Sequence, residues 1–236
     1  MNESLKEKYT SLIYLIERLE FSLKELEKFK VKKVSANGPP KLYLLTWKLK
    51  SYFQTCLYRI IELTEQSLVS WDSSLPSVTY LLVRSVLETS AYLYDLAQRF
   101  ENIIKSSQDI NHLTEFIDKW KFGEKNSEEL PVITNIKTII QRVSKQYPEV
   151  DDMYNKLSSF CHPNYSAVGM LYSYQNMDEM CFYIDSKYGL REDLFNALLS
   201  ILIKSLELTK QANNKLEPLY PIINELNKKA QDSHKY

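Results

Sequence analysis

The strongest constraint on the fold is an apolar repeat along the first thirty residues. Its positions advance by alternating steps of four and three, and they are Leu5, Tyr9, Leu12, Ile16, Leu19, Leu23 and Leu26. This spacing predicts a helix with one continuous apolar seam, and most charged residues lie off that seam. Two interpretations are open: the seam packs against another helix of the same chain, or it joins two copies of the chain in a homodimer.

The next segments extend the helical pattern. Residues Lys32–Pro40 contain Asn-Gly and two prolines, which cannot continue a helix. Helical periodicity returns from Lys41 to about Trp71, so residues 1–71 are predicted to form a helical hairpin. A third helix is expected to start in the cluster Asp72–Ser77, which offers serine caps and a proline. It is apolar on almost every face as far as Ala97, which is typical of a central helix.

The rest of the chain predicts further helices. They are expected near 113–120, from Pro131, over 150–161, over 190–213 and in a final segment that reaches about 229. Two aromatic-rich stretches flank a polar segment and favour a short β-hairpin near 170–184. We expect an all-α bundle of about six to eight helices. Residues 1–236 are predicted to be a single domain, with a core bundle over 77–213 and a C-terminal helix and tail over 214–236.

Composition excludes several classes of protein. The chain has 30 basic and 30 acidic residues, so bulk charge favours neither nucleic acid nor an anionic membrane. Its four glycines are too few for a large sheet with many tight turns. Three widely spaced cysteines and three histidines indicate no disulfide framework and no zinc site, and they fit a cytoplasmic protein. No signal peptide, membrane span or cofactor motif is visible, so we expect no metal and no cofactor.

One polar stripe crosses the predicted central helix. Between Leu75 and Ala97 its only charged residues are Arg84, Glu88 and Asp95, and helical geometry places all three on one side. They form either an ion pair that sets the register of the helix, a solvent-facing edge, or a polar functional site.

A second polar group ends the helix predicted over 150–161. Steps of four residues bring Tyr154, Ser158 and His162 to one side of that helix. At a helix C-terminus the macrodipole favours a charged imidazole, and a carboxylate such as Glu88 would favour it further. The alternative is that His162 shapes the turn before Pro163. Ser158 is no nucleophile without a base oriented on it.

These residues define two candidate sets. The catalytic candidates are Arg84, Glu88 and His162, and the binding candidates are Tyr154, Ser158, Asn164 and Tyr165. We expect Arg84, Glu88 and His162 to share one neighbourhood.

The same two segments carry a family resemblance. Arg84-Ser-Val-Leu-Glu88-Thr-Ser-Ala-Tyr-Leu-Tyr and Tyr154-Asn-Lys-Leu-Ser158-Ser-Phe-Cys-His162-Pro-Asn-Tyr165 resemble uncharacterised bacterial HEPN-like helical proteins, over about residues 78–170. The resemblance implies a helical fold and a prokaryotic defence or toxin–antitoxin context. HEPN-type ribonucleases cleave RNA without metal, using an arginine and a histidine of one short motif that is usually paired across a dimer. By resemblance, Arg84 stabilises the phosphate and His162 is the general acid or base, although here 78 positions separate them.

Two functions are therefore open. The first is a binding or regulatory module that contacts a protein partner through the N-terminal seam or the aromatic segment 170–183. The second is a metal-independent ribonuclease in which Arg84 and His162 converge on an open cleft, and RNA is a partner only in that case.

Overall fold

The structure is a computed structural model that describes residues 3–35, 40–106, 113, 114, 117, 134–185 and 187–233. Its helices are α1 (Glu3–Lys8), the 3-10 turn η1 (Thr10–Leu12), α2 (Ile13–Glu27), α3 (Pro40–Asp72), α4 (Pro76–Ser106), α6 (Ile136–Val143), α7 (Glu149–Cys161), α8 (Tyr165–Tyr172), α9 (Glu192–Leu216) and α10 (Leu219–Ser233). An antiparallel hairpin of β1 (Ser173–Asn176) and β2 (Cys181–Ile184) accompanies them. The predicted all-α bundle with a short β-hairpin is confirmed.

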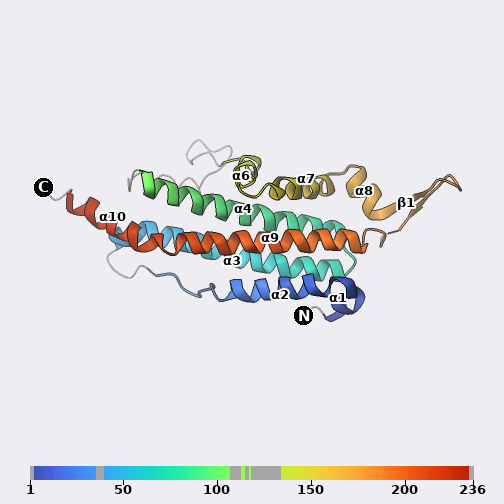
Figure 1. The fold of residues 1–236 in the computed structure, drawn as a ribbon, viewed down its shortest axis with the longest axis horizontal. Helices are drawn as coiled ribbons and strands as arrows, with labels where there is room; N and C mark the ends of the chain where they lie inside the picture. The colour runs from blue at the N-terminus through green and yellow to red at the C-terminus, as the bar shows by residue number, and fades with distance from the viewer. Residues whose placement is uncertain are drawn as a thin grey trace.

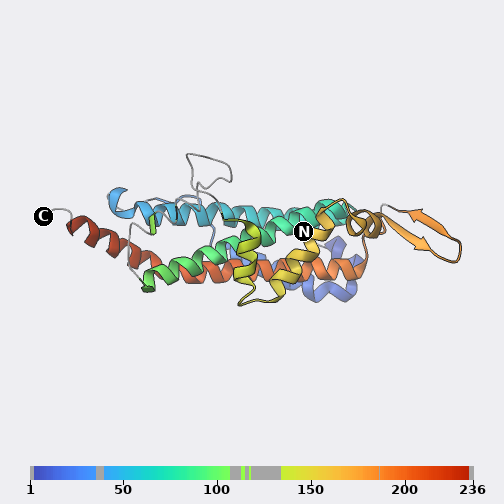
Figure 2. The ribbon, with the colours of Figure 1, turned by 90° about the horizontal axis from the view of Figure 1, so that it is seen from above.

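The bundle is elongated (Figures 1 and 2). Helices α2, α3, α4 and α9 run side by side along its long axis, and α6 and α7 lie against α4. The β-hairpin projects from one end, and α10 extends toward the other. Helix α4 packs most extensively against α9 and α3. It therefore has the central position that its apolar faces predict.

The turn between α3 and α4 follows from its local sequence. Ser74 has a left-handed backbone with φ of 62°, and the amide of Leu75 donates to the carbonyl of Ser70 at 2.9 Å. This bond satisfies one of the carbonyls at the end of α3. Pro76 then starts α4, where its fixed φ fits the first turn of a helix.

The N-terminal apolar seam is buried within the chain. Six of its seven positions are buried, namely Leu5, Tyr9, Leu12, Ile16, Leu19 and Leu26, and Leu23 is partly buried against the same core. Helix α2 packs more extensively against α9 than against α3, its expected hairpin partner. The structure thus shows the first of the two interpretations. A coiled coil through these residues would require their release from the core.

The continuous N-terminal helix expected over the first thirty residues is interrupted. Tyr9 has φ of −124° and ψ of 64°, which is not helical, and it separates α1 from η1 and α2. Its ring packs 4.7 Å from that of Phe195, and its hydroxyl accepts from Trp71 Nε1 at 3.0 Å and donates to the Leu190 carbonyl at 3.1 Å. These tertiary contacts override the helical preference of the segment.

In the second half of the chain, the structure agrees with some of the elements predicted from the sequence and differs from others. Helix α7 ends at Cys161, directly before His162 and Pro163, as expected. The stretch that starts at Met170 was expected to be a strand, but Met170–Tyr172 belong to α8 and β1 begins at Ser173. Most of the helix expected near 113–120 and the start of the helix expected from Pro131 lie outside the described residues.

Candidate functional site

Arg84 and Glu88 lie on α4, and Arg84 contacts α7 through Tyr154. Arg84 Nε donates to Glu88 Oε1 at 2.8 Å, and Arg84 Nη2 donates to the Tyr154 hydroxyl at 3.2 Å. The guanidinium carbon lies 5.3 Å from the centre of the Tyr154 ring, within range of a cation–π contact. The structure thus brings together two catalytic candidates and one binding candidate.

The electrostatics of this cluster hold Arg84 in its charged form. Burial by itself lowers the pKa of Arg84, but the hydrogen bond and charge of Glu88, together with Tyr154 and Cys161, raise that pKa above its usual value. Burial also raises the pKa of the Cys161 thiol, against the opposing effect of Arg84. The Arg84 and Glu88 side chains are 24% and 28% exposed, so this is a partly solvated pair within α4, and only the contact of Arg84 with Tyr154 reaches α7.

Ser158 lies one turn beyond Tyr154 on α7. Its Oγ is buried, and it has no hydrogen-bond partner among the described residues. An unpaired buried hydroxyl costs free energy, so this atom destabilises the packing of α7. No hydrogen bond among the described residues joins a histidine to this hydroxyl, so in that part of the chain no base is oriented on it for nucleophilic chemistry.

His162 and Asn164 lie in the connection between α7 and α8. His162 follows the last residue of α7 with extended φ and ψ of −101° and 148°, and its side chain is exposed. Asn164 caps α8 by accepting a hydrogen bond from the Ala167 amide at 3.1 Å. Tyr165 opens α8, and its side chain lies outside the described set. No hydrogen bond or ion pair of the described residues links His162 to Arg84 or Glu88.

The ribonuclease prediction has a direct test in His162→Ala. If His162 transfers a proton, this variant lowers metal-free RNA cleavage by about a hundredfold or more, because general acid or base catalysis is lost. Its melting temperature stays unchanged, because the side chain is exposed. The control His234→Ala replaces a histidine outside the candidate set. Equal or absent cleavage in the wild type and His162→Ala would remove the ribonuclease interpretation.

The third charge of the stripe, Asp95, pairs with a residue that sequence reasoning missed. Arg142 of α6 approaches Asp95 Oδ2 through Nη1 at 3.2 Å. Asp95 is 5% exposed, and burial raises the pKa of its carboxyl group, against the opposing charges of Arg142 and Arg99. The stripe of α4 therefore faces α7 at one end and α6 at the other. No signal in the sequence connects Asp95 with Arg142, because they are 47 positions apart.

The β-hairpin is anchored tightly at its base. The Asp185 amide donates to the Tyr172 carbonyl, and the Gly189 amide donates to the Leu171 carbonyl, both at 2.8 Å. A Cβ atom at position 189 would lie 2.8 Å from that same Leu171 oxygen, so the approach requires glycine. The hairpin is thus held in a defined direction as it leaves the bundle (Figure 1).

Beyond this base, the hairpin is the most apolar exposed part of the described chain. Its exposed large side chains are Tyr174, Met177, Met180, Phe182, Tyr183 and Ile184. A concentration of apolar surface on a projecting element is typical of a contact site. The hairpin contains most of segment 170–183, one of the two surfaces proposed from the sequence as partner-facing.

The fold and its sites define the protein as an elongated helical bundle with a projecting, aromatic β-hairpin. In comparisons with known proteins, no family model, curated protein or solved structure matches the chain. Within the described residues, no cluster of three or more histidine, cysteine or acidic side chains is placed to hold a metal ion. No helix in that same part of the chain has the length and apolarity needed to cross a membrane.

Proposed function

We propose that the protein is a binding module that works as a homodimer joined through its β-hairpin. One observation carries the proposal: all four residues of β2 are exposed. A two-stranded hairpin is marginally stable in water, and both of its edges carry unpaired backbone groups. Pairing with the hairpin of a second copy supplies the missing strands.

The two faces of the hairpin support this assignment. On one face Tyr174 stacks on both Tyr183 and Tyr188, with ring centres 5.1 and 5.2 Å apart, so these rings cover one another in part. Residues of a strand alternate between faces, and Phe182 and Ile184 therefore lie on the other face. They are 56% and 84% exposed, which leaves them available to a second copy.

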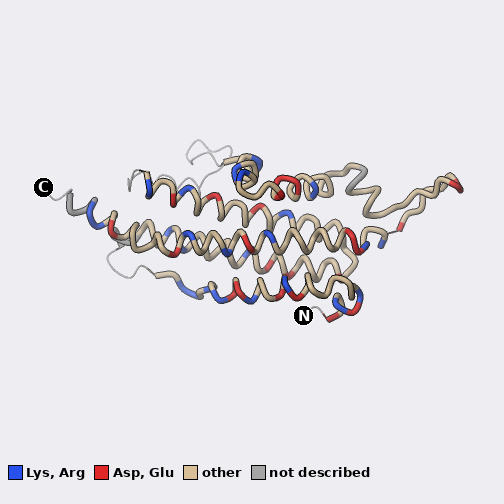
Figure 3. Tube along the Cα trace, in the orientation of Figure 1, with Lys and Arg blue, Asp and Glu red and all other residues tan. Residues whose placement is uncertain are grey.

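Charge favours an antiparallel pair of hairpins. Asp178 and Glu179 lie at the tip, which is acidic in Figure 3. The base has mixed charge: Lys187 lies there near Asp185, and Arg191 pairs with Asp193. When two β2 strands pair antiparallel, the tip of each copy lies beside the base of the other. The acidic tip of each copy then lies near Lys187 of its neighbour, and the two tips stay apart.

Phe182→Asp tests the proposed dimer. A charge at this apolar contact is expected to weaken association by at least tenfold in Kd, as measured by sedimentation equilibrium, because the carboxylate would have to be desolvated. Phe21→Asp is the matched control, since Phe21 on α2 is 63% exposed and lies outside the hairpin. The control should associate like the wild type, and both variants should keep the wild-type helical spectrum.

A charge exchange tests the orientation of the pair. Asp178→Lys and Lys187→Asp should each weaken the dimer, and the double variant should restore it, because the tip and base then attract again. A wild-type chain that sediments as a monomer throughout the concentration range would refute the dimer. Equal weakening by Phe182→Asp and Phe21→Asp would place the contact elsewhere.

As part of the same proposal, the HEPN-like resemblance implies a prokaryotic defence or toxin–antitoxin context for this module. Dimer formation through the hairpin leaves the N-terminal seam in the core, so it requires no rearrangement of α2.

A further inference from the structure

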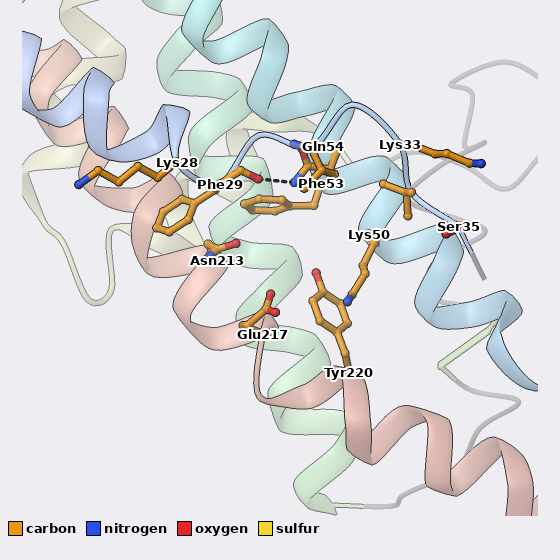
Figure 4. Close-up of a pocket in the computed structure, with 12 residues that line it drawn as sticks. Lys28, Phe29, Lys33, Ser35, Lys50, Phe53, Gln54, Asn213, Glu217 and Tyr220 are labelled. Atoms are coloured by element: carbon orange, nitrogen blue, oxygen red, sulfur yellow. Dashed lines mark hydrogen bonds between the residues drawn. The ribbon is translucent and has the colours of Figure 1, made fainter. Parts of the chain in front are cut away.

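A cavity of about 470 Å³ lies between the segment that follows α2, helix α3 and the junction of α9 with α10 (Figure 4). It is remote from the hairpin, which projects from the opposite end of the bundle (Figure 1). A cavity of this size suits a small molecule.

The outer wall of the cavity is fixed to α3. Gln54 Nε2 donates to the Phe29 carbonyl at 2.8 Å, and its Oε1 accepts from the Val31 amide at 3.0 Å. Trp47 Nε1 donates to the Val34 carbonyl at 3.1 Å. Two side chains of one helix thus hold the extended segment by its backbone, so the cavity is a built feature of the fold.

Three aromatic rings, together with Val31 and Val34, form the apolar part of the lining. Phe29 comes from the segment after α2, Phe53 from α3 and Tyr220 from α10. Figure 4 shows the three rings around the same space. Rings from three different elements suit a flat, apolar ligand body better than a flexible chain.

Two opposite charges line the cavity without pairing. Lys50 Nζ lies 4.3 Å from the centre of the Tyr220 ring, and among the described residues it has no carboxylate partner. Glu217 likewise has no cationic partner in that part of the chain, and the amide of Asn213 lies close to it in Figure 4. The other two lysines of the lining, Lys28 and Lys33, extend away from the cavity.

We propose that this cavity binds a small zwitterion with an aromatic body, such as an aromatic amino acid or a close derivative. Lys50 binds the carboxylate of the ligand, Glu217 and Asn213 bind its ammonium group, and the three rings enclose its side chain. This arrangement gives each unpaired charge of the cavity a partner of opposite charge. Hydrogen bonds between charged groups are stronger than those between neutral groups. The site is independent of the hairpin dimer.

Three small compounds that differ in their charged groups test the ligand class on the wild-type protein. L-Tryptophan has both charges, tryptamine lacks the carboxylate, and indole-3-propionate lacks the amine. Isothermal titration calorimetry should show L-tryptophan binding at least tenfold tighter than either analogue, because each analogue lacks one of the two charged groups that Lys50 and Glu217 would bind. Absence of binding by all three at millimolar concentration would overturn the proposal, and so would equal affinity for all three.

Variants then locate the site. Lys50→Met and Glu217→Gln should each weaken L-tryptophan binding at least tenfold. The matched controls are Lys33→Met, whose side chain extends away from the cavity, and Glu225→Gln, an exposed position of α10. Equal weakening by the controls would place the ligand elsewhere. The probe comparison on the wild type decides the ligand class even if a variant fails to fold.

Discussion

Trp71→Ala is expected to lower the free energy of unfolding by about 3–5 kcal/mol, because it removes a large side chain from a fully buried position. Trp71 is stacked on Phe195 with ring centres 5.0 Å apart, and its indole nitrogen donates to the Tyr9 hydroxyl at 3.0 Å. The loss leaves a cavity and removes one of the two hydrogen bonds of the Tyr9 hydroxyl group, which keeps its bond to the Leu190 carbonyl. Thermal denaturation should show a drop in Tm of about 10 °C or more.

The chain offers a matched control on the same helix. Trp47 also lies in α3 and donates its indole hydrogen to a backbone carbonyl, but it is partly exposed. Trp47→Ala should therefore cost much less than Trp71→Ala. Similar losses of Tm in the two variants would show that the junction of Tyr9, Trp71 and Phe195 is not a centre of stability.

Arg142→Met is expected to cost about 2–3 kcal/mol near neutral pH, because it leaves the buried carboxylate of Asp95 without its nearest partner. Breaking a fully buried pair costs more, but Arg142 is 37% exposed and water screens part of the interaction. Urea denaturation at pH 7 measures this loss. The variant Arg142→Met with Asp95→Asn should recover much of it, since the amide has no charge to bury.

The pH dependence of this variant has a defined sign. Burial raises the pKa of Asp95 in the folded protein above the value of about 4 that aspartate has in an unfolded chain. Between these two values the folded state binds more protons, so its stability decreases as the pH rises. Loss of Arg142 raises the folded pKa further and widens that window, although Arg99 still opposes the shift. Parallel pH profiles for the wild type and Arg142→Met would contradict this account.

Much of the helical architecture could be predicted from local pattern. The seam of α2 and the all-round apolar faces of α4 follow from periodicity, and the ends of α3 and α7 follow from the residues that precede Pro76 and Pro163. These features depend on residues within one or two helical turns. The break at Tyr9 could not be predicted, because it depends on Trp71, Leu190 and Phe195, which are distant in sequence.

In the candidate site, too, the contacts within one helix could be predicted, but the contacts between helices could not. Arg84 and Glu88 are one helical turn apart, so their ion pair follows from spacing alone. The contact of Arg84 with Tyr154 depends on how α7 is rotated against α4, and the pairing of Asp95 with Arg142 depends on where α6 lies. The aromatic content of segment 170–183 indicated the hairpin, but its projection beyond the bundle is a property of the whole fold.

The packing of α2 on α9 has a consequence for the synthesis of the chain. The apolar seam near the N-terminus is covered mainly by residues 192–216, and Arg18 pairs with Glu207, which is 189 positions away. Ribosomes add about 5–20 residues per second, so about 10–40 s pass between the synthesis of the seam and the synthesis of α9. During that interval the apolar side chains of the seam lack the cover that α9 gives them in the folded protein. We expect chaperones that bind exposed apolar segments to contact the nascent chain, although the folded protein keeps that seam in its core.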